Sequence, residues 1–336
     1  MHHMRQKFSM AVATTFTLVL LGTTVQGQTG PDPAAAEIAF EIRMDALRDT
    51  PMYKMAQSAI ESQPGMVPGN GDVEKIKRVW GAVQLPDKVA DIDEAGSADQ
   101  VPMDLFIRVE LEDKEAADQM VSEMIKDSNE VKEGGETFYT PKNGPDNLRA
   151  RRANDTTVEV ATKNFFAKGI GEERFSPGLK KAWGMFSDEP IRIAFDLENA
   201  RGLVDEGLGM AKDQMEPMMH GMLDMVNKMD NVRIAMDFQD GSNLMALGMT
   251  SSDEDTAEEL RNGLDGLLGM AKMMGGAQVE QLKQIDEGMA NTVSALLKSL
   301  QANREGDDVQ INIPKPEGFD ETLKSMMSMG GMGSDF

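Results

Sequence analysis

The chain has 336 residues, no cysteine and a formal net charge of −23. The absence of cysteine excludes disulfides, thiolate catalysis and thiolate metal sites, so stability must come from a hydrophobic core. The acidic surface repels nucleic acid phosphates and anionic lipid headgroups, so neither is expected as a partner. A chain of this length is expected to divide into about two domains.

The N-terminal residues have the pattern of a secretory signal peptide. Arg5 and Lys7 precede an apolar stretch over residues 8–25, and small or tolerated residues follow up to Gly27. The pattern predicts a signal peptide over residues 1–27 and an exported protein, periplasmic or extracellular, without stable membrane insertion after cleavage. A retained membrane anchor is the alternative, although the stretch is barely long enough to span a bilayer.

Apolar residues that alternate with polar ones predict strands in both halves of the chain. The first predicted strand of each half leads directly into helical sequence; in the first half Asp49 or Thr50 can cap the helix, with Pro51 at its first position. The dipeptide Asp240-Gly241 predicts a hairpin. The predicted strands are residues 38–44, 79–85 and 105–111 in the first half, and residues 191–197, 232–238 and 245–249 in the second.

An acidic helix start follows the third strand of each half. Residues 113–120 match residues 253–260 in pattern, and acids in the first turn suit the positive end of the helix dipole. Apolar residues three and four positions apart predict one buried stripe on each helix. The stripes are Ala117, Met120 and Met124 in the first helix, and Ala257, Leu260 and Leu264 in the second.

Each half is predicted to close with a hairpin and a helix. These are residues 149–160 with a helix over 178–186, and residues 300–313 with a helix over 319–327. The second half carries extra helical sequence over residues 207–229 and 277–297.

The recurrence of these elements in the same order predicts an internal duplication. The predicted fold is α+β: two similar units of mainly antiparallel sheet with helices packed on one face, arranged as a pseudo-symmetric pair. The units cover residues 37–188 and 189–327. Predicted flexible segments are residues 28–36, 65–71, 91–101 and the Met/Gly-rich tail 328–336.

The residues that commonly carry catalysis are sparse. His220 is the one histidine left after signal removal, and the Gly-x-Ser-x-Gly nucleophile motif is absent. No phosphate loop or dinucleotide fingerprint predicts a cofactor, and residues 237–241 lack the spacing of a calcium loop. Carboxylates are abundant enough to leave a two-carboxylate hydrolase open, although few aromatic residues are present to line a sugar cleft.

Methionine is unusually frequent, with 29 residues in the whole chain. Flexible methionines can fill irregular core space. They can also form a soft-metal site for Cu(I), or an adaptable groove for an apolar ligand or a partner helix. The candidate metal ligands lie at spacings of four, three and four on a predicted helix: Met218, Met222, Met225 and Met229.

The run from Arg152 to Thr162, followed by a helix and then by the strand 191–197 that enters Glu198-Asn199-Ala200-Arg201, resembles uncharacterised exported bacterial proteins. That resemblance implies export and the repeated strand-and-helix unit, and it carries no catalytic residue. The sequence therefore favours an exported, non-catalytic protein with a binding or envelope role. A carrier of Cu(I) or of an apolar ligand, and a carboxylate-type hydrolase, are the alternatives.

Overall fold

The computed structural model describes residues 35–54, 73–86, 104–142, 147–168, 171–205, 220–239 and 241–330. The predicted signal peptide and the predicted flexible segments 65–71 and 91–101 lie outside these residues, as do residues 28–34 and 331–336 of the predicted flexible ends.

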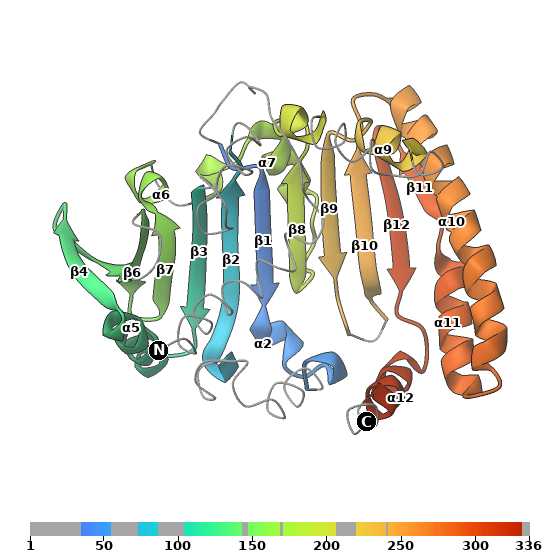
Figure 1. Ribbon diagram of the computed structural model, residues 1–336, viewed down its shortest axis with the longest axis horizontal. Helices are drawn as coiled ribbons and strands as arrows, with labels where there is room; N and C mark the ends of the chain where they lie inside the picture. The colour runs from blue at the N-terminus through green and yellow to red at the C-terminus, as the bar shows by residue number, and fades with distance from the viewer. Residues whose placement is uncertain are drawn as a thin grey trace.

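Twelve strands of the described residues form one sheet, and the strands pair antiparallel throughout (Figure 1). The α+β class and the antiparallel pairing are therefore confirmed. The strands are β1 (Ile38–Arg43), β2 (Ile76–Gln84), β3 (Asp104–Leu111), β4 (Ser128–Glu133), β5 (Glu136–Pro141), β6 (Leu148–Asn154), β7 (Thr157–Thr162), β8 (Ile191–Asp196), β9 (Asn231–Met236), β10 (Asn243–Thr250), β11 (Ala302–Glu305) and β12 (Asp308–Pro314).

Strand β1 lies in the middle of the sheet, between β2 and β8. From this centre the order runs β1, β2, β3, β7, β6, β5, β4 in one direction and β8, β9, β10, β12, β11 in the other. The two halves of the chain thus share one continuous sheet. This order is compatible with the predicted duplication, which stays a prediction, as do the domain boundaries.

The helices start where the sequence supplies a capping side chain. Asp113 accepts a hydrogen bond from the amide of Ala116 (2.8 Å), and Asp253 accepts one from Thr256 (2.8 Å), so both predicted acidic helix starts are confirmed. Thr50 caps helical residues 51–54 in the same way, by accepting from the amide of Tyr53. The helices are α2 (Met44–Leu47), α5 (Lys114–Lys126), α6 (Lys163–Lys168), α7 (Pro177–Gly184), α9 (His220–Val226), α10 (Glu254–Leu282), α11 (Glu287–Ser299) and α12 (Phe319–Gly330).

The structure differs from the sequence predictions in two elements. The helix predicted over residues 277–297 is divided between α10 and α11, because Asp286 caps a new helix by accepting from the amide of Met289 (2.9 Å). The hairpin β4–β5 was not predicted, although Gly134 and Gly135 join its strands with φ of 62° and 86°. Of the helix predicted over residues 207–229, the described part contains α9, and residues 206–219 lie outside it.

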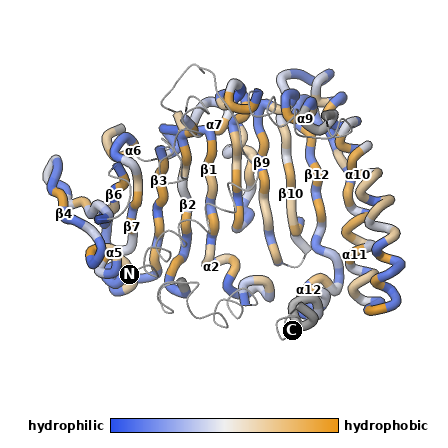
Figure 2. The backbone as a smooth tube through the Cα atoms, viewed as in Figure 1, coloured by the Kyte–Doolittle hydropathy of each residue, from blue (hydrophilic) through white to orange (hydrophobic). Residues whose placement is uncertain are grey.

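Apolar and polar residues alternate along many of the strands (Figure 2). Because successive side chains point to opposite faces, the sheet has two chemically different faces. One face, which we call the apolar face, carries the side chains of Ile38, Phe40 and Ile42 of β1 and of their cross-strand neighbours. Helices α5 and α10 pack on its two ends, over Val109 and Val158 at one end and over Met249 and Val309 at the other.

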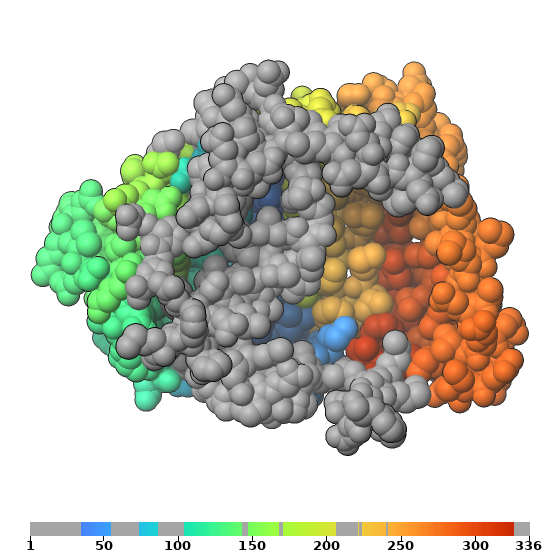
Figure 3. Space-filling model, viewed as in Figure 1, coloured from blue at the N-terminus to red at the C-terminus, as the bar shows by residue number. Residues whose placement is uncertain are grey.

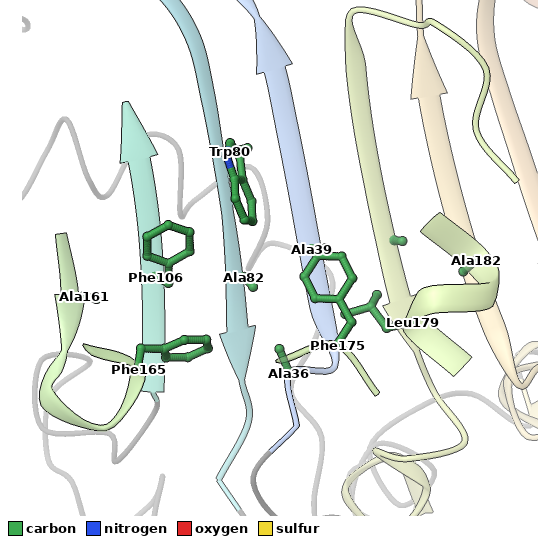
Figure 4. Close-up of a cluster of buried hydrophobic side chains, with 11 residues drawn as sticks. Ala36, Ala39, Trp80, Ala82, Phe106, Ala161, Phe165, Phe175, Leu179 and Ala182 are labelled. Carbon is green, nitrogen blue, oxygen red and sulfur yellow. The ribbon is translucent and has the colours of Figure 1, made fainter. Parts of the chain in front are cut away.

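The opposite face, which we call the mixed face, is also covered by helices. The alanines Ala39, Ala82 and Ala194 leave room above the strands for Phe165 at α6 and Leu179 of α7 (Figure 4). The structure therefore places helices on both faces, whereas the sequence predicts one. Small strand residues opposite large aromatic ones explain the difference, because close packing needs the two to complement each other.

Candidate functional site

The apolar face is a candidate binding surface. Cross-strand pairing aligns its side chains in three rows between β7 and β12. No charged residue lies within these rows, but Arg152 of β6 and Arg304 of β11 pair with the end residues Val158 and Val309. The rows are Val158, Val109, Val79, Ile42, Ile191, Met236, Met245 and Ile313; then Val160, Ile107, Gly81, Phe40, Ile193, Ile234, Leu247 and Ile311; then Leu105, Val83, Ile38, Phe195, Val232, Met249 and Val309.

Burial is uneven along these rows. The third row is deeply buried at Ile38, Met249 and Val309. In the first row the outermost residue, Val158, is buried, and the residues from Val109 to Ile313 are half-buried. Strands β9, β10 and β12 are visible in a hollow beside α10 and α11 (Figure 3). The first row therefore offers partly exposed apolar side chains next to a helical wall.

Two buried glutamates on the mixed face each form ion pairs with two arginines. Glu159 of β7 lies between Arg108 (2.7 Å) and Arg151 (2.8 Å), and Glu41 of β1 lies between Arg78 and Arg192. Arg108 also stacks over the ring of Trp80, and Arg192 over that of Trp183. Glu41 and Glu159 are both about 1% exposed, so these ion pairs hold the strands together and neither of the two carboxylates is open to a substrate.

A second group of carboxyls lies in the middle of the sheet, at the strand ends where the start of β1 meets the end of β8. Glu37, just before β1, accepts hydrogen bonds from the amide of Leu85 (2.8 Å) and from Nδ2 of Asn199 (2.8 Å). Asp196, the last residue of β8, accepts from the Ser176 hydroxyl and from the amide of Asn199 (3.0 Å). Ser176 in turn caps α7 by accepting from Leu179.

This cluster is buried and lacks a cationic partner among its described contacts. Burial raises the pKa of Glu37 to about 7, and the neighbouring Asp196 adds to the rise, although the two hydrogen bonds to the carboxyl oppose it. Glu37 and Asp196 are 8 % and 2 % exposed, so a substrate cannot reach either carboxyl. Glu37 and Asp196 are the neighbouring acids that the hypothesis of a two-carboxylate hydrolase requires, but these two carboxyls are not accessible to a substrate.

The predicted methionine ligands are only partly described. Met218 lies outside the described residues, and Met222 belongs to α9 without a described side chain. Met225 lies against Gly263 of α10, and Met229 is 9 % exposed in the core cluster beneath α10. Both described side chains pack among aliphatic residues, and the Cu(I) site stays a prediction.

The remaining site predictions have simple outcomes. His220 is the first residue of α9, and its side chain is not described. The predicted turn near Gly241 joins the antiparallel strands β9 and β10, and Gly241 has a φ of 82°, so the hairpin is confirmed. Within the described ranges, no three His, Cys, Asp or Glu side chains gather as metal ligands would.

Sequence reasoning missed Glu37, Asn199 and the arginine pairs of the mixed face. The alternation of β1 places Glu41 on the face opposite Ile38, Phe40 and Ile42, and no signal within this strand shows that helices also bury that face. No sequence signal places Asn199 beside Glu37, since the two meet only when β1 and β8 pair.

No family model matches this chain, and no curated protein sequence matches it. Among solved structures, crystal form IV of TP0453 is similar at 10% sequence identity and a TM-score of 0.43, over 90% of this chain and 97% of that chain. Crystal form I of TP0453 is similar at 9% identity and a TM-score of 0.39, over 90% and 98% of the two chains. Structural similarity at this level gives no information about function. In the described part of the chain, no helix combines the length and the apolar composition that crossing a membrane requires.

Proposed function

We propose that this chain is an exported, non-catalytic binding protein that holds an apolar ligand on the apolar face of its sheet. The proposal is carried by one observation: the first row of that face is uncharged and half-buried from Val109 to Ile313. Apolar surface left partly in water costs free energy, about 25 cal/mol per Å², and a ligand that covers it recovers that free energy.

The chemistry of the rows defines the ligand class. Hydrocarbon side chains with charged neighbours only at the ends of the rows suit an uncharged, elongated apolar molecule, since an anionic group would meet the field of a strongly acidic protein. Met236 and Met245 lie directly opposite each other on β9 and β10, and their unbranched side chains can adapt to a flexible ligand. A second row of apolar side chains lies beside them and extends the surface.

An uncharged apolar fluorophore, N-phenyl-1-naphthylamine, tests the proposal on the mature protein. We expect saturable binding to the wild type, and an affinity about tenfold lower in a Met236→Gln/Met245→Gln variant because two amides replace apolar contacts. The matched control is Met273→Gln/Met274→Gln, whose methionines are 73% and 67% exposed on α10. Circular dichroism and the melting temperature establish that both variants are folded.

Two results would contradict the proposal. One is a wild type that gives no saturable fluorescence increase. The other is a folded Met236→Gln/Met245→Gln variant that binds the fluorophore as tightly as the control does.

Export rests on the N-terminal pattern and is part of the proposal. Expression of the full chain in a bacterial host, followed by mass spectrometry of the purified protein, should give an N-terminus at Gln28. An intact N-terminus in the membrane fraction would favour the retained anchor instead.

A further inference from the structure

Three methionines of α10 are largely exposed to solvent. Met270, Met273 and Met274 are 47%, 73% and 67% exposed, whereas the core methionines Met249 and Met289 are 2% and 5% exposed. Filling irregular core space is the common structural role of methionine, and it accounts for the two buried residues. It does not account for the three exposed residues of α10.

The three thioethers lie on one side of the helix. Residues three and four positions apart are neighbours, with Cβ atoms about 5–6 Å apart, so Met270 is adjacent to both Met273 and Met274. Helical side chains lean toward the N-terminus of their helix, which directs Met274 over Met270, and Met273 over Gly269. Methionine side chains are unbranched and flexible, so the three sulfur atoms can converge on one point above this turn.

Glycines keep this side of α10 open. A Cβ at Gly266, Gly269 or Gly276 would meet open space, whereas one at Gly275 would overlap Leu297 of α11. Glycine inside a helix is less favourable than alanine, and close packing explains it only at the last of these positions. The three open glycines leave the neighbouring thioethers within reach of a small ion from solvent.

The electrostatic setting favours a soft cation at this point. Residues 266–279 contain no acid, and Lys272 is their one charged residue. At roughly 100° per residue, Lys272 lies about 150° around the helix from the centre of the three methionines, so its charge is on the far side. The net charge of −23 gives the whole chain a field that attracts cations. Hard divalent cations need oxygen ligands, which these side chains do not supply.

We propose that Met270, Met273 and Met274 form a binding site for a soft monovalent cation, Cu(I), on the outer side of α10. Thioether sulfur is a soft ligand that selects Cu(I). The site differs from the soft-metal site predicted from the sequence, since it lies on another helix and its thioethers are exposed. It does not depend on the apolar ligand proposed above.

Calorimetric titration of the mature protein with Ag(I) in a chloride-free buffer tests the site, because Ag(I) is a soft monovalent ion that air does not oxidise. We expect a saturable site in the wild type and its loss in Met270→Leu/Met273→Leu/Met274→Leu, since leucine has no sulfur. The matched control is Met185→Leu, whose methionine is 40% exposed outside α10 and which should keep the wild-type affinity. Circular dichroism and the melting temperature establish that both variants are folded.

Methyl resonances of methionine show which thioethers bind the ion. Saturating Ag(I) should shift the methyl signals of Met270, Met273 and Met274, assigned from single leucine variants, while the signal of the buried Met249 stays in place. Zn(II) at the same concentration should leave the three signals unshifted. Under nitrogen, Cu(I) titrated against a competing chelator should show the same loss of affinity in the triple variant as Ag(I) does.

Three results would overturn the proposal. The first is a wild type without saturable Ag(I) binding. The second is a folded triple variant that binds Ag(I) or Cu(I) as tightly as Met185→Leu does. The third is a set of methyl signals from Met270, Met273 and Met274 that do not move at saturation.

Discussion

Arg233 of β9 reaches across Gly248 of β10 and binds Asp308 of β12 through both terminal nitrogens, with Nη1–Oδ1 at 2.7 Å and Nη2–Oδ2 at 2.5 Å. The pair is buried on the mixed face, with side chains 9% and 7% exposed. A methyl group at Gly248 would overlap the guanidinium, so glycine at this position makes the bridge possible.

Gly248→Ala should therefore destabilise the protein almost as much as loss of the ion pair itself. Breaking a buried pair by removing one partner costs about 3–5 kcal/mol, because a charge is left buried without compensation. The free energy of unfolding from denaturant titration measures both Gly248→Ala and Asp308→Asn. A Gly248→Ala variant within about 0.5 kcal/mol of wild type would show that the bridge tolerates a methyl group.

The two aspartate caps should respond alike to mutation and to acid. Asp113→Ala and Asp253→Ala each remove the acceptor for one helix amide, and we expect each to lower the melting temperature by about 2 °C at pH 7. The helix amides lower the pKa of both carboxyls. A carboxyl whose pKa is lower in the folded chain stabilises the fold at pH values above its pKa in the unfolded chain. This stabilisation is lost as the pH falls through the pKa of the carboxyl in the folded chain.

The difference in melting temperature between wild type and each cap variant should therefore become smaller at pH values below 3.8, the ordinary pKa of an aspartate. Thermal unfolding at a series of pH values measures it. A difference that stays constant down to pH 2 would contradict the capping role.

The β4–β5 turn should depend on its glycines. Gly134 and Gly135 have positive φ, where a Cβ is unfavourable by about 1–2 kcal/mol. Gly135→Ala should therefore increase hydrogen exchange in β4 and β5 while the rest of the sheet is unaffected. The control is Gly184→Ala in α7, where a Cβ meets open space at ordinary helical φ. Equal exchange in β4 and β5 of both variants would contradict the prediction.

Met225 tests whether the methionine-rich helix is packing or a metal site. Its side chain lies against Gly263 within the core beneath α10, so Met225→Leu should change stability by less than about 1.5 kcal/mol. Because a packed thioether is not free to bind a metal, we also expect no change in Cu(I) affinity, measured by titration against a competing chelator. A marked loss of Cu(I) affinity in Met225→Leu would restore the soft-metal hypothesis.

Local patterns predicted local structure well. The acids at positions 113 and 253 predicted both helix starts, and the alternation around Phe40 and Ile193 predicted the two strands that pair at the centre of the sheet. These signals operate within one turn or one strand, so a single sequence contains them. The same reasoning overlooked Gly134-Gly135, although that dipeptide is a recognised hairpin turn.

Contacts between distant segments were not predictable in this way. The cluster at Glu37 forms because β8 pairs with β1, and this places Asn199 beside a residue far away along the chain. The partners of Glu41 likewise come from two different neighbouring strands. Periodicity gives the face on which a residue lies, but it does not say which strand lies next to it.

The central place of β1 has a consequence for biosynthesis. Strand β1 is translated before the other strands of the described residues, but its partner β8 emerges only after β2 to β7. Pairings between distant residues form slowly. The edge of β1 that faces β8 is therefore unpaired while the first half of the chain is made, and it stays open to pairing with another chain until translation passes Asp196.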